Sequence, residues 1–473
     1  MLCGVAARGT VEDLTPKHRP HTPLPYGPMP QPAFVTSQLL VSAVVILVVV
    51  HVILITVAYL IYLERKISAY IQDRIGPNRV GFDFGLPILK PLRGMLGLGQ
   101  PLADGLKFLL KEDYQPNGAD RALFTLAPMA SIIPALIGFV VIPWGGQWTV
   151  PAFDIPILGW HITEQTVVVA GANVNAGVIY LLAVASLGVY GVTLGGWASN
   201  SKFSFFGGLR ATAQMLAYEI PLGLSLLAAL LLLGTVSPTA IVEHQITHGW
   251  LIFSQPMAAI IFFIAILAEA NRAPFDNAEA ESELVGGYHT EYSSMRFALF
   301  FLAEYAHMIT SCAFFTMIFL GGWDVVPFIP VLPVEASGWL GVGIVLAKFG
   351  VFFGKVVTLI CFMMVIRWTL PRLRFDQVMM MSWQGVIPLS LAVVVMTAVM
   401  VYFDLRGMVP MLLANAALAL VVVGVQGLLP RRVPNRAIPM YGSRFRPMPG
   451  ERVATAPSDP LARADHPVTG ASS

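Results

Sequence analysis

Charged residues and cysteines are both scarce in this 473-residue sequence. Only 12% of its residues are charged, against about 25% in an ordinary soluble domain, and 56% are hydrophobic. The mean hydropathy is +0.71. This composition argues against a soluble globular enzyme, a disordered chain and a fibrous protein. The net charge of +2 gives no indication of nucleic-acid binding.

Residue patterns for cofactor binding are also lacking. The three cysteines, Cys3, Cys312 and Cys361, are too scattered for a disulfide framework, a zinc site or a thiolate iron–sulfur motif. There is no P-loop and no glycine-rich dinucleotide fingerprint after a strand. His244 and His248 lie four residues apart in a predicted outside loop, where solvation is favoured over metal binding. We expect this chain to bind no metal and no redox cofactor of its own.

Long apolar runs are abundant, and a bilayer core needs roughly 20 apolar residues per helix. They predict an all-α, polytopic membrane bundle of about nine transmembrane helices. The alternative is eight helices with a peripheral hairpin, because the last two runs are joined only by residues 402–410. The nine runs are residues 39–63, 123–142, 178–194, 213–233, 251–268, 297–320, 340–365, 385–401 and 411–429, and the third could begin near Val167.

Basic residues indicate the orientation, because cytoplasmic loops are enriched in lysine and arginine. With nine helices and the C-terminus inside, 23 of the 29 basic residues lie in inside segments and four in outside segments. We therefore expect a bacterial plasma-membrane protein with its N-terminus outside and its C-terminus in the cytoplasm. Residues 1–32 are expected to be a disordered polar extension, 33–429 the transmembrane domain, and 430–473 a basic, then disordered, tail.

The first inside loop contains a predicted amphipathic helix at residues 101–112. Wound as a helix, its leucines share one face, and Asp104, Lys107 and Lys111 share the other. Pro101 suits the first helical position. The pattern predicts a helix in the membrane interface. Its basic residues could contact lipid headgroups, or the Asp104/Lys107 pair could form a polar pocket in an apolar wall.

The third inside loop and the start of the next span are acidic, against the basic trend of the other inside loops. Aromatic and aliphatic residues alternate with the acids, which disfavours a simple solvated loop. Close carboxylates at a low dielectric cannot all ionise, so some pKa values should rise toward neutral and suit proton transfer. The acids are Glu269, Asp276, Glu279, Glu281, Glu283, Glu291 and Glu304, and the basic residues are Arg272 and Arg296.

Three charged residues fall inside other predicted spans. Glu219 precedes Pro221, which we expect to loosen the helix and free carbonyl groups for water. Inserting a carboxylate costs about 3 kcal/mol or more, so such a residue is functional by default. By the same argument, Lys348 and Lys355 are candidate functional residues, although Lys355 could simply extend its amine to the membrane interface.

Several longer motifs resemble one family, the H subunits (mitochondrial subunit 1) of proton-pumping NADH:quinone oxidoreductase, respiratory complex I. The resemblance covers residues 39–384, in which the motifs follow the expected order without a departure at the charged positions. The motifs are E-R-K to I-G-P-N-R-V-G at 64–81, Q-P-L-A-D with Lys107 at 100–107, G-W-A-S-N-S-K at 196–202, A-E-A-N-R-A-P-F-D with Glu279 at 268–279, E-S-E-L-V-G-G at 281–287, A-E-Y at 303–305 and R-L-R-F-D-Q at 372–377.

The resemblance implies a membrane-side part of a quinone chamber, which quinone enters between the first and sixth helices. Arg65 matches an arginine near that entrance, and Asp104, Lys107, Phe275 and Phe297 match chamber positions. A funnel of acids is implied to link the chamber to the membrane proton path: Glu219, Glu269, Glu279, Glu281, Glu283, Glu291 and Glu304. Supporting charges are expected at Arg210, Arg272, Arg296, Arg372, Arg374 and Asp376.

The same resemblance implies that the chain acts only as one part of a larger complex, with membrane lipid and quinone around it. FMN and iron–sulfur clusters would belong to partner subunits of the peripheral arm, and further partners to the membrane arm. Two other functions stay open: the equivalent subunit of a membrane hydrogenase or another donor-linked complex, and an independent ion-coupled transporter. We detect no inverted repeat of the kind that transporters have. The sequence does not distinguish menaquinone from ubiquinone.

Overall fold

The computed structural model describes residues 37–82, 94, 96–155, 160–162, 164–329, 331–428, 451–452 and 468–469. The chain divides into two units, Met1–Asn415 and Ala416–Ser473, so the boundary falls inside the last long helix, α14 (Met408–Leu428). The predicted extension at 1–32 lies outside the described residues. Of the predicted tail, only β6 (Glu451–Arg452) and β7 (Val468–Thr469), which pair antiparallel, are described.

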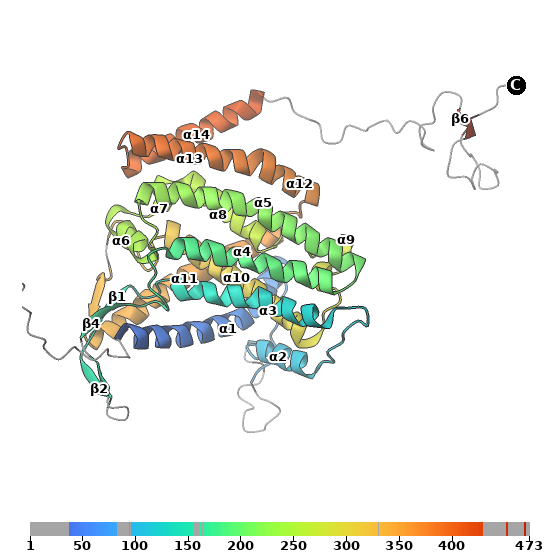
Figure 1. Ribbon diagram of the computed structural model, residues 1–473, viewed down its shortest axis with the longest axis horizontal. Coiled ribbons are helices and arrows are strands. Elements are labelled where there is room, and N and C mark those ends of the chain that lie inside the picture. Colours follow the sequence, from blue (N-terminus) through green and yellow to red (C-terminus); the bar gives the residue numbers. More distant parts are fainter. Residues whose placement is uncertain are drawn as a thin grey trace, which may run out of the picture. The chain divides into compact units, whose positions relative to one another are not determined.

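The first unit is a bundle of long apolar helices that run side by side (Figure 1). Eight helical segments in the described part of the chain are long and apolar enough to cross a membrane. This confirms the predicted all-α membrane bundle. The segments are α1 (Ser37–Ile71), α3 (Arg121–Ile137) with the 3-10 turn η2 (Gly138–Val141), α4 (Gly177–Ala198), α5 (Lys202–Leu233), α10 (Ser294–Phe319), α11 (Leu340–Thr369), α14, and a continuous run of α12 (Phe375–Met380), the π-helical η4 (Met381–Val386) and α13 (Ile387–Tyr402).

The predicted span at 251–268 is interrupted. It forms α7 (Leu251–Ser254) and α8 (Pro256–Glu269), separated by Gln255. Pro256 has no backbone N–H, and the Gln255 side chain is buried, where its amide donates to the carbonyl of Ala228. The 14 residues of α8 span about 21 Å, less than the ~30 Å hydrocarbon core. The fifth of the nine predicted spans is therefore built from two short helices, α7 and α8.

Short strands occupy one end of the bundle, where the sequence analysis predicted only loops. β1 (Gln147–Val150) pairs antiparallel with β4 (Gln165–Val168) and parallel with β5 (Glu335–Ser337), and β2 (Phe153–Ile155) pairs antiparallel with β3 (Trp160–Ile162). The possible early start of the third span near Val167 is wrong, because that residue belongs to β4. The helix α6 (Pro238–His248) lies at the same end (Figure 1).

The predicted amphipathic helix is present at the other end of the bundle as α2 (Gln100–Leu110) (Figure 1). It stops two residues before the predicted end, because Lys111 is extended. α2 contacts both α1 and α10. Leu106, Leu109 and Leu110 are exposed on its outer face, as an interfacial helix requires.

Close helix packing at this end comes from small residues. A Cβ atom on Gly191 of α4 would lie 2.0 Å from Oγ of Ser131 of α3, so only glycine allows these helices to approach so closely. Beside this contact, an aromatic core holds the loop between α8 and α10 against the bundle. In it, the rings of Phe124 and Tyr292 stack with centroids 4.0 Å apart.

Candidate functional site

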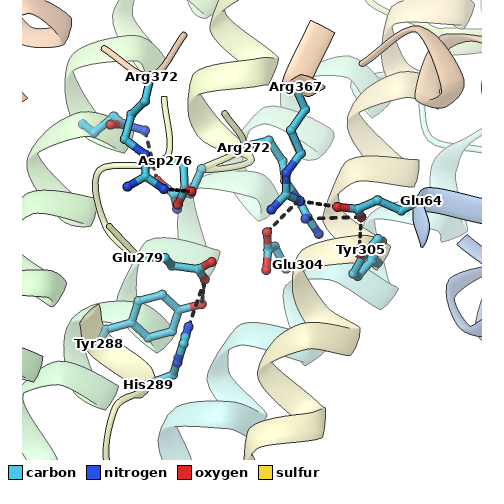
Figure 2. Close-up of polar contacts among 12 residues, drawn as sticks. Glu64, Arg272, Asp276, Glu279, Tyr288, His289, Glu304, Tyr305, Arg367 and Arg372 are labelled. Atoms are coloured by element: carbon cyan, nitrogen blue, oxygen red, sulfur yellow. Dashed lines mark hydrogen bonds and ion pairs between the residues drawn. The ribbon is translucent and has the colours of Figure 1, made fainter. Parts of the chain in front are cut away.

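The charged residues converge where α1 and α11 end and where the loop between α8 and α10 passes between them (Figure 2). This loop contains the short helix α9 (Glu281–Leu284) and the 3-10 turn η3 (Gly287–His289). Gln214 of α5, which is fully buried, donates to the carbonyl groups of Ala268 and Phe275. A buried amide with these partners fixes the start of the loop.

Arg272 is the centre of the first cluster. Its Nε atom lies 2.8 Å from Oε1 of Glu304, and its Nη1 atom lies 3.6 Å from Oε2 of Glu64. Glu64 also pairs with Arg367 of α11 and accepts a hydrogen bond from the hydroxyl of Tyr305. Two carboxylates thus balance two guanidinium groups in a site where three of the four side chains are about 10% exposed. Burial opposes the charge of Arg272, but Glu304, Tyr305 and Glu64 hold its pKa well above the ordinary value.

Glu279 forms a second cluster with two neighbours from η3. Its Oε1 atom lies 3.4 Å from Nε2 of His289 and accepts a 3.3 Å hydrogen bond from the hydroxyl of Tyr288 (Figure 2). Burial alone would raise the pKa of Glu279, but the hydrogen bond and charge of His289, together with Arg272, hold that pKa below 4.5. Burial, and then Glu279, raise the pKa of the Tyr288 phenol.

Asp276 is a second buried acid of this loop. Arg372 donates to its Oδ2 atom over 2.7 Å. Burial and the charge of Glu279 raise the pKa of Asp276 even though Arg372 and Arg367 oppose the shift. Asp276 and Glu279 therefore have opposite pKa shifts within one buried loop, which is the arrangement expected where protons are exchanged.

One backbone position determines the shape of this loop. Gly287 has φ +65°, and a Cβ atom there would lie 1.8 Å from the carbonyl oxygen of Ala278. No L-residue with a side chain fits such a contact. Gly287 therefore allows η3 to fold back onto Ala278, which brings His289 to Glu279.

The predicted chamber residues Arg65 and Asp104 are brought together. Arg65 of α1 forms a 2.8 Å ion pair with Asp104 of α2, and Gln100 donates to the same carboxylate over 3.0 Å. Of the two alternatives for these charges, a local Asp104/Lys107 pocket is not the arrangement seen: Asp104 pairs across helices with Arg65, and the Nζ atom of Lys107 lies 4.8 Å from the ring centroid of Phe108. The physical reason is the packing of α1 against α2, which places the guanidinium beside the carboxylate.

The two predicted chamber phenylalanines lie in different surroundings. The ring centroid of Phe297 of α10 lies 6.1 Å from that of Phe108 of α2. The ring of Phe297 also meets the ring of His289 edge-on, with the centroids 5.2 Å apart. Phe275 is buried, and its ring lies 5.5 Å from that of Tyr218 of α5. Thus Phe297 joins α2 to the Glu279 cluster, whereas Phe275 packs against the inner face of α5.

Three predicted acids lie in the helices. Glu304 and Glu269 line a cavity of about 50 Å³ together with His307, whose Nε2 atom lies 3.5 Å from Oε1 of Glu269. A space of that size with these polar side chains on its wall can hold more than one water. Glu269 and His307 also line a second cavity of about 20 Å³ that extends between α4 and α10.

Glu219, the third of these acids, lies apart from the cavities. It accepts a hydrogen bond from the hydroxyl of Ser186 of α4. α5 continues without a break from Lys202 to Leu233, so the expected effect of Pro221 is confined to one carbonyl: that of Ala217, four residues earlier, accepts a hydrogen bond from the hydroxyl of Ser382. The carboxylate is therefore satisfied by a neighbouring helix rather than by an opened backbone.

The remaining predicted acids lie near the surface. Glu283 pairs with Arg210 over 2.5 Å at the rim, Glu281 is exposed and Glu291 is half-buried. Glu279 and Glu283 do not share a helical face. α9 begins only at Glu281, so Glu279 turns inward while Glu283 turns outward.

The remaining supporting charges stabilise element ends. The Nε atom of Arg296 lies 3.4 Å from Oδ2 of Asp113, and its guanidinium group lies over the ring of Phe124. The backbone N–H of Arg374 donates to Oε1 of Gln377, and Asp376 lies in the first turn of α12, where a negative charge is favourable.

The two lysines that the sequence places in a span are structural anchors. The amine of Lys355 donates to the carbonyl groups of Leu320, Gly322 and Asp324, and that of Lys348 donates to the carbonyl of Val334. They hold the loop after α10 onto α11. Neither amine simply extends to the interface.

Sequence reasoning assigned no site role to Glu64, Arg367, Tyr288, His289 or Tyr305. Glu64 and Tyr305 stand in two of the quoted motifs, and His289 is three residues from Gly286 in a buried turn, so position in a motif was the available signal. Within the described residues, no group of three or more His, Cys, Asp or Glu side chains could hold a metal ion.

The sequence of this chain matches one protein family and several of its members. The sequence profile of the NADH dehydrogenase family matches residues 44–398. One H subunit of the NADH-quinone oxidoreductases of Geobacter sulfurreducens is 45% identical over 358 residues, which are 75% of this chain and 93% of that protein. An H subunit of Cytophaga hutchinsonii is 42% identical (76% and 96% covered), and the H subunit of Flavobacterium johnsoniae is 40% identical (76% and 95% covered). The chain therefore belongs to the NADH dehydrogenase family, as a membrane component of the NADH-quinone oxidoreductase complex of the H-subunit type.

Proposed function

We propose that this chain forms the membrane-side part of the quinone chamber of respiratory complex I and an acidic link from that chamber to the proton path of the membrane arm. The observation that carries the proposal is a series of neighbouring residues. Asp104 of α2, which pairs with Arg65 of α1, lies one helical turn from Phe108, whose ring lies beside that of Phe297. The ring of Phe297 in turn meets that of His289, which pairs with Glu279.

The chamber mouth would lie where α2 meets α1 and α10. α2 contacts both helices and exposes leucines that suit an isoprenoid tail. Asp104 is only 17% exposed and has polar partners, so it can orient a headgroup carbonyl or hydroxyl through Arg65 and Gln100. Apolar walls with a few fixed polar groups are the usual composition of a site for such a ligand.

Reduction of the quinone would act on the acids by charge. Two unit charges 4 Å apart interact by about 4 kcal/mol at an effective dielectric of 20, which corresponds to roughly three pKa units. A proton taken up from His289 or Tyr288 would leave Glu279 without its nearest donor. The pKa of Glu279 would then rise, and Glu279 would take up a proton. Once neutral, Glu279 would no longer raise the pKa of Asp276, so the pKa of Asp276 would fall.

Protons would pass inward through the Arg272 cluster. Glu304 faces both Arg272 and the cavity that it shares with Glu269 and His307. Water in that cavity can join the two acids by hydrogen bonds. Glu219, paired with Ser186 of α4, would be the acid nearest the membrane arm.

The remaining parts of the assignment concern partners and orientation. Electrons would come from FMN and iron–sulfur clusters in peripheral-arm subunits, and protons would leave through membrane-arm subunits. The basic residues around α2 and the end of α11 support a cytoplasmic position for the charged end in a bacterial plasma membrane. With the C-terminus inside, a reporter that works only in the cytoplasm is active at Ser473, and activity of a periplasm-only reporter there would contradict this orientation.

The experiment that tests the chamber is Asp104→Asn in the assembled complex. We expect normal assembly and normal NADH oxidation with an artificial acceptor that takes electrons upstream of the quinone. Quinone reduction should fall about tenfold, because a charge-assisted pair with Arg65 is lost. Asp404→Asn, an exposed acid at the opposite end, is the matched control. Unchanged quinone kinetics in assembled Asp104→Asn complex would refute the assignment.

A further inference from the structure

A cavity of about 370 Å³ lies at the end of the bundle opposite the acid clusters. It is formed where α5 ends, α6 meets α7, and the turn between α13 and α14 closes over them. Its lining is divided into an apolar part and a polar part. The apolar part includes Leu232, Leu233 and Met408, and the polar part includes His244, His248 and Arg406.

Arg406 supplies the positive charge of this cavity. Among the described residues of the loops at this end, it is the one lysine or arginine. Its Nε atom lies 3.5 Å from Oδ1 of Asp404. Both side chains are more than half exposed, so this ion pair contributes little to stability. The planar guanidinium is therefore available for two parallel hydrogen bonds to a phosphate group.

The two histidines supply hydrogen-bonding groups that line the cavity together with Arg406. Their rings stack with centroids 4.2 Å apart and planes at 13°, so the pair does not form the converging geometry of a metal clamp. Burial and the neighbouring His248 lower the pKa of His244. The Nδ1 atom of His244 is buried and has no hydrogen-bond partner in the described part of the chain. Such an unpaired atom is uncommon and indicates a site that a ligand or water completes.

The position of the cavity matches the headgroup layer of a bilayer. Leu232 and Leu233 end one long apolar helix, and Met408 begins another. Tyr402 and Phe403, which precede the turn, are 84% and 66% exposed, as aromatic residues are at the boundary of the hydrocarbon core. Acyl chains can therefore pass along the leucines while a phosphate lies level with Arg406.

From this arrangement we infer that the cavity binds the phosphodiester group of a membrane phospholipid, held by Arg406 with His244 and His248, with its acyl chains against Leu232, Leu233 and Met408. The site stands on residues remote from the proposed quinone chamber. It stabilises the turn between α13 and α14 on the ends of α5 and α6, and it does not depend on the quinone assignment.

The test uses the assembled complex in nanodiscs that contain a phosphatidylglycerol with a diazirine on its acyl chain. After illumination, we expect crosslinks on the peptides that contain Leu233 and Met408. Arg406→Gln should reduce this adduct about tenfold, which corresponds to about 1.4 kcal/mol. Arg121→Gln, which removes an exposed arginine at the start of α3, should leave the adduct unchanged.

Two further arms identify the source of the phosphate. A diacylglycerol with the same diazirine, which lacks phosphate, should label these peptides at the level of Arg406→Gln. Inorganic phosphate should not compete with the lipid. Equal labelling by phospholipid and diacylglycerol, equal labelling of wild type and Arg406→Gln, or loss of labelling with inorganic phosphate would each overturn the proposal.

Discussion

The ring of His289 lies between the aromatic side chain of Phe297 and the carboxylate of Glu279. Its centroid is 5.2 Å from that of Phe297, with the planes at 85°, and its Nε2 atom is 3.4 Å from Oε1 of Glu279. Phe297 in turn lies beside Phe108 of α2. The imidazole of His289 therefore contacts both the aromatic side chains near α2 and the buried acid Glu279.

His289→Gln should weaken this connection without preventing assembly. The hydrogen bond and charge of His289 are the leading influences that lower the pKa of Glu279, so that pKa should rise in the variant. If quinone reduction needs the ionised form of Glu279, the acidic limb of the pH–rate profile for this reaction moves to higher pH in His289→Gln. The rate at neutral pH should fall by roughly threefold to tenfold.

His51→Gln is the matched control for that experiment. His51 is exposed on α1, where its ring contacts the carbonyl of Leu47, away from the acids. Its profile should equal that of the wild type. An unshifted acidic limb in His289→Gln complex would show that the imidazole has no influence on the acid.

Glu64→Gln should reduce the amount of assembled complex. The change leaves Arg272 with one carboxylate and removes the charge that balances Arg367. An unpaired buried charge costs about 3–5 kcal/mol, enough to reduce the amount of assembled complex on native gels. Glu112→Gln, at an exposed position after α2, should assemble normally. Normal amounts of Glu64→Gln complex would mean that the cluster is open to solvent.

Glu219→Gln should leave assembly intact, because the amide keeps the size of the side chain and can still bond to Ser186. If Glu219 carries protons, turnover with quinone and proton pumping fall together in proteoliposomes, since the two processes are coupled. Pumping at the normal rate and ratio would identify Glu219 as a structural residue satisfied by Ser186.

The two loop acids give opposite contributions to stability with pH. The pKa of Glu279 is depressed below 4.5, so its contribution is present above pH 4.5 and is lost as the pH falls through the depressed value. The pKa of Asp276 is raised above 3.8, so its contribution is present below pH 3.8 and is lost as the pH rises through the raised value.

Acid should therefore loosen the Glu279 contacts only below pH 4.5. Amide hydrogen exchange in residues 278–292, corrected for its intrinsic pH dependence, should accelerate there in the wild type. Glu279→Gln should remove this pH dependence. Acceleration that begins well above pH 4.5, or that persists unchanged in Glu279→Gln, would show that Glu279 is not the titrating group.

The sequence predicted the helices better than the contacts of the charged residues. Apolar runs located the long helices, and the spacing of leucines located α2, because both patterns are local. Glu64 pairs with Arg367, 303 residues away, and with Tyr305, 241 residues away, and no local pattern reports such contacts. The inward turn of Glu279 depends on Gly287 folding back onto Ala278, which periodicity along a helix does not anticipate.

The most direct test of the central claim is to locate the quinone itself. A quinone with a photoreactive group on its headgroup should label this chain in the assembled complex, on peptides that contain Asp104 or Phe297. An excess of unlabelled quinone should suppress the labelling, and Asp104→Asn should reduce it. Labelling confined to other subunits, or labelling of these peptides that excess quinone does not suppress, would contradict the proposed chamber.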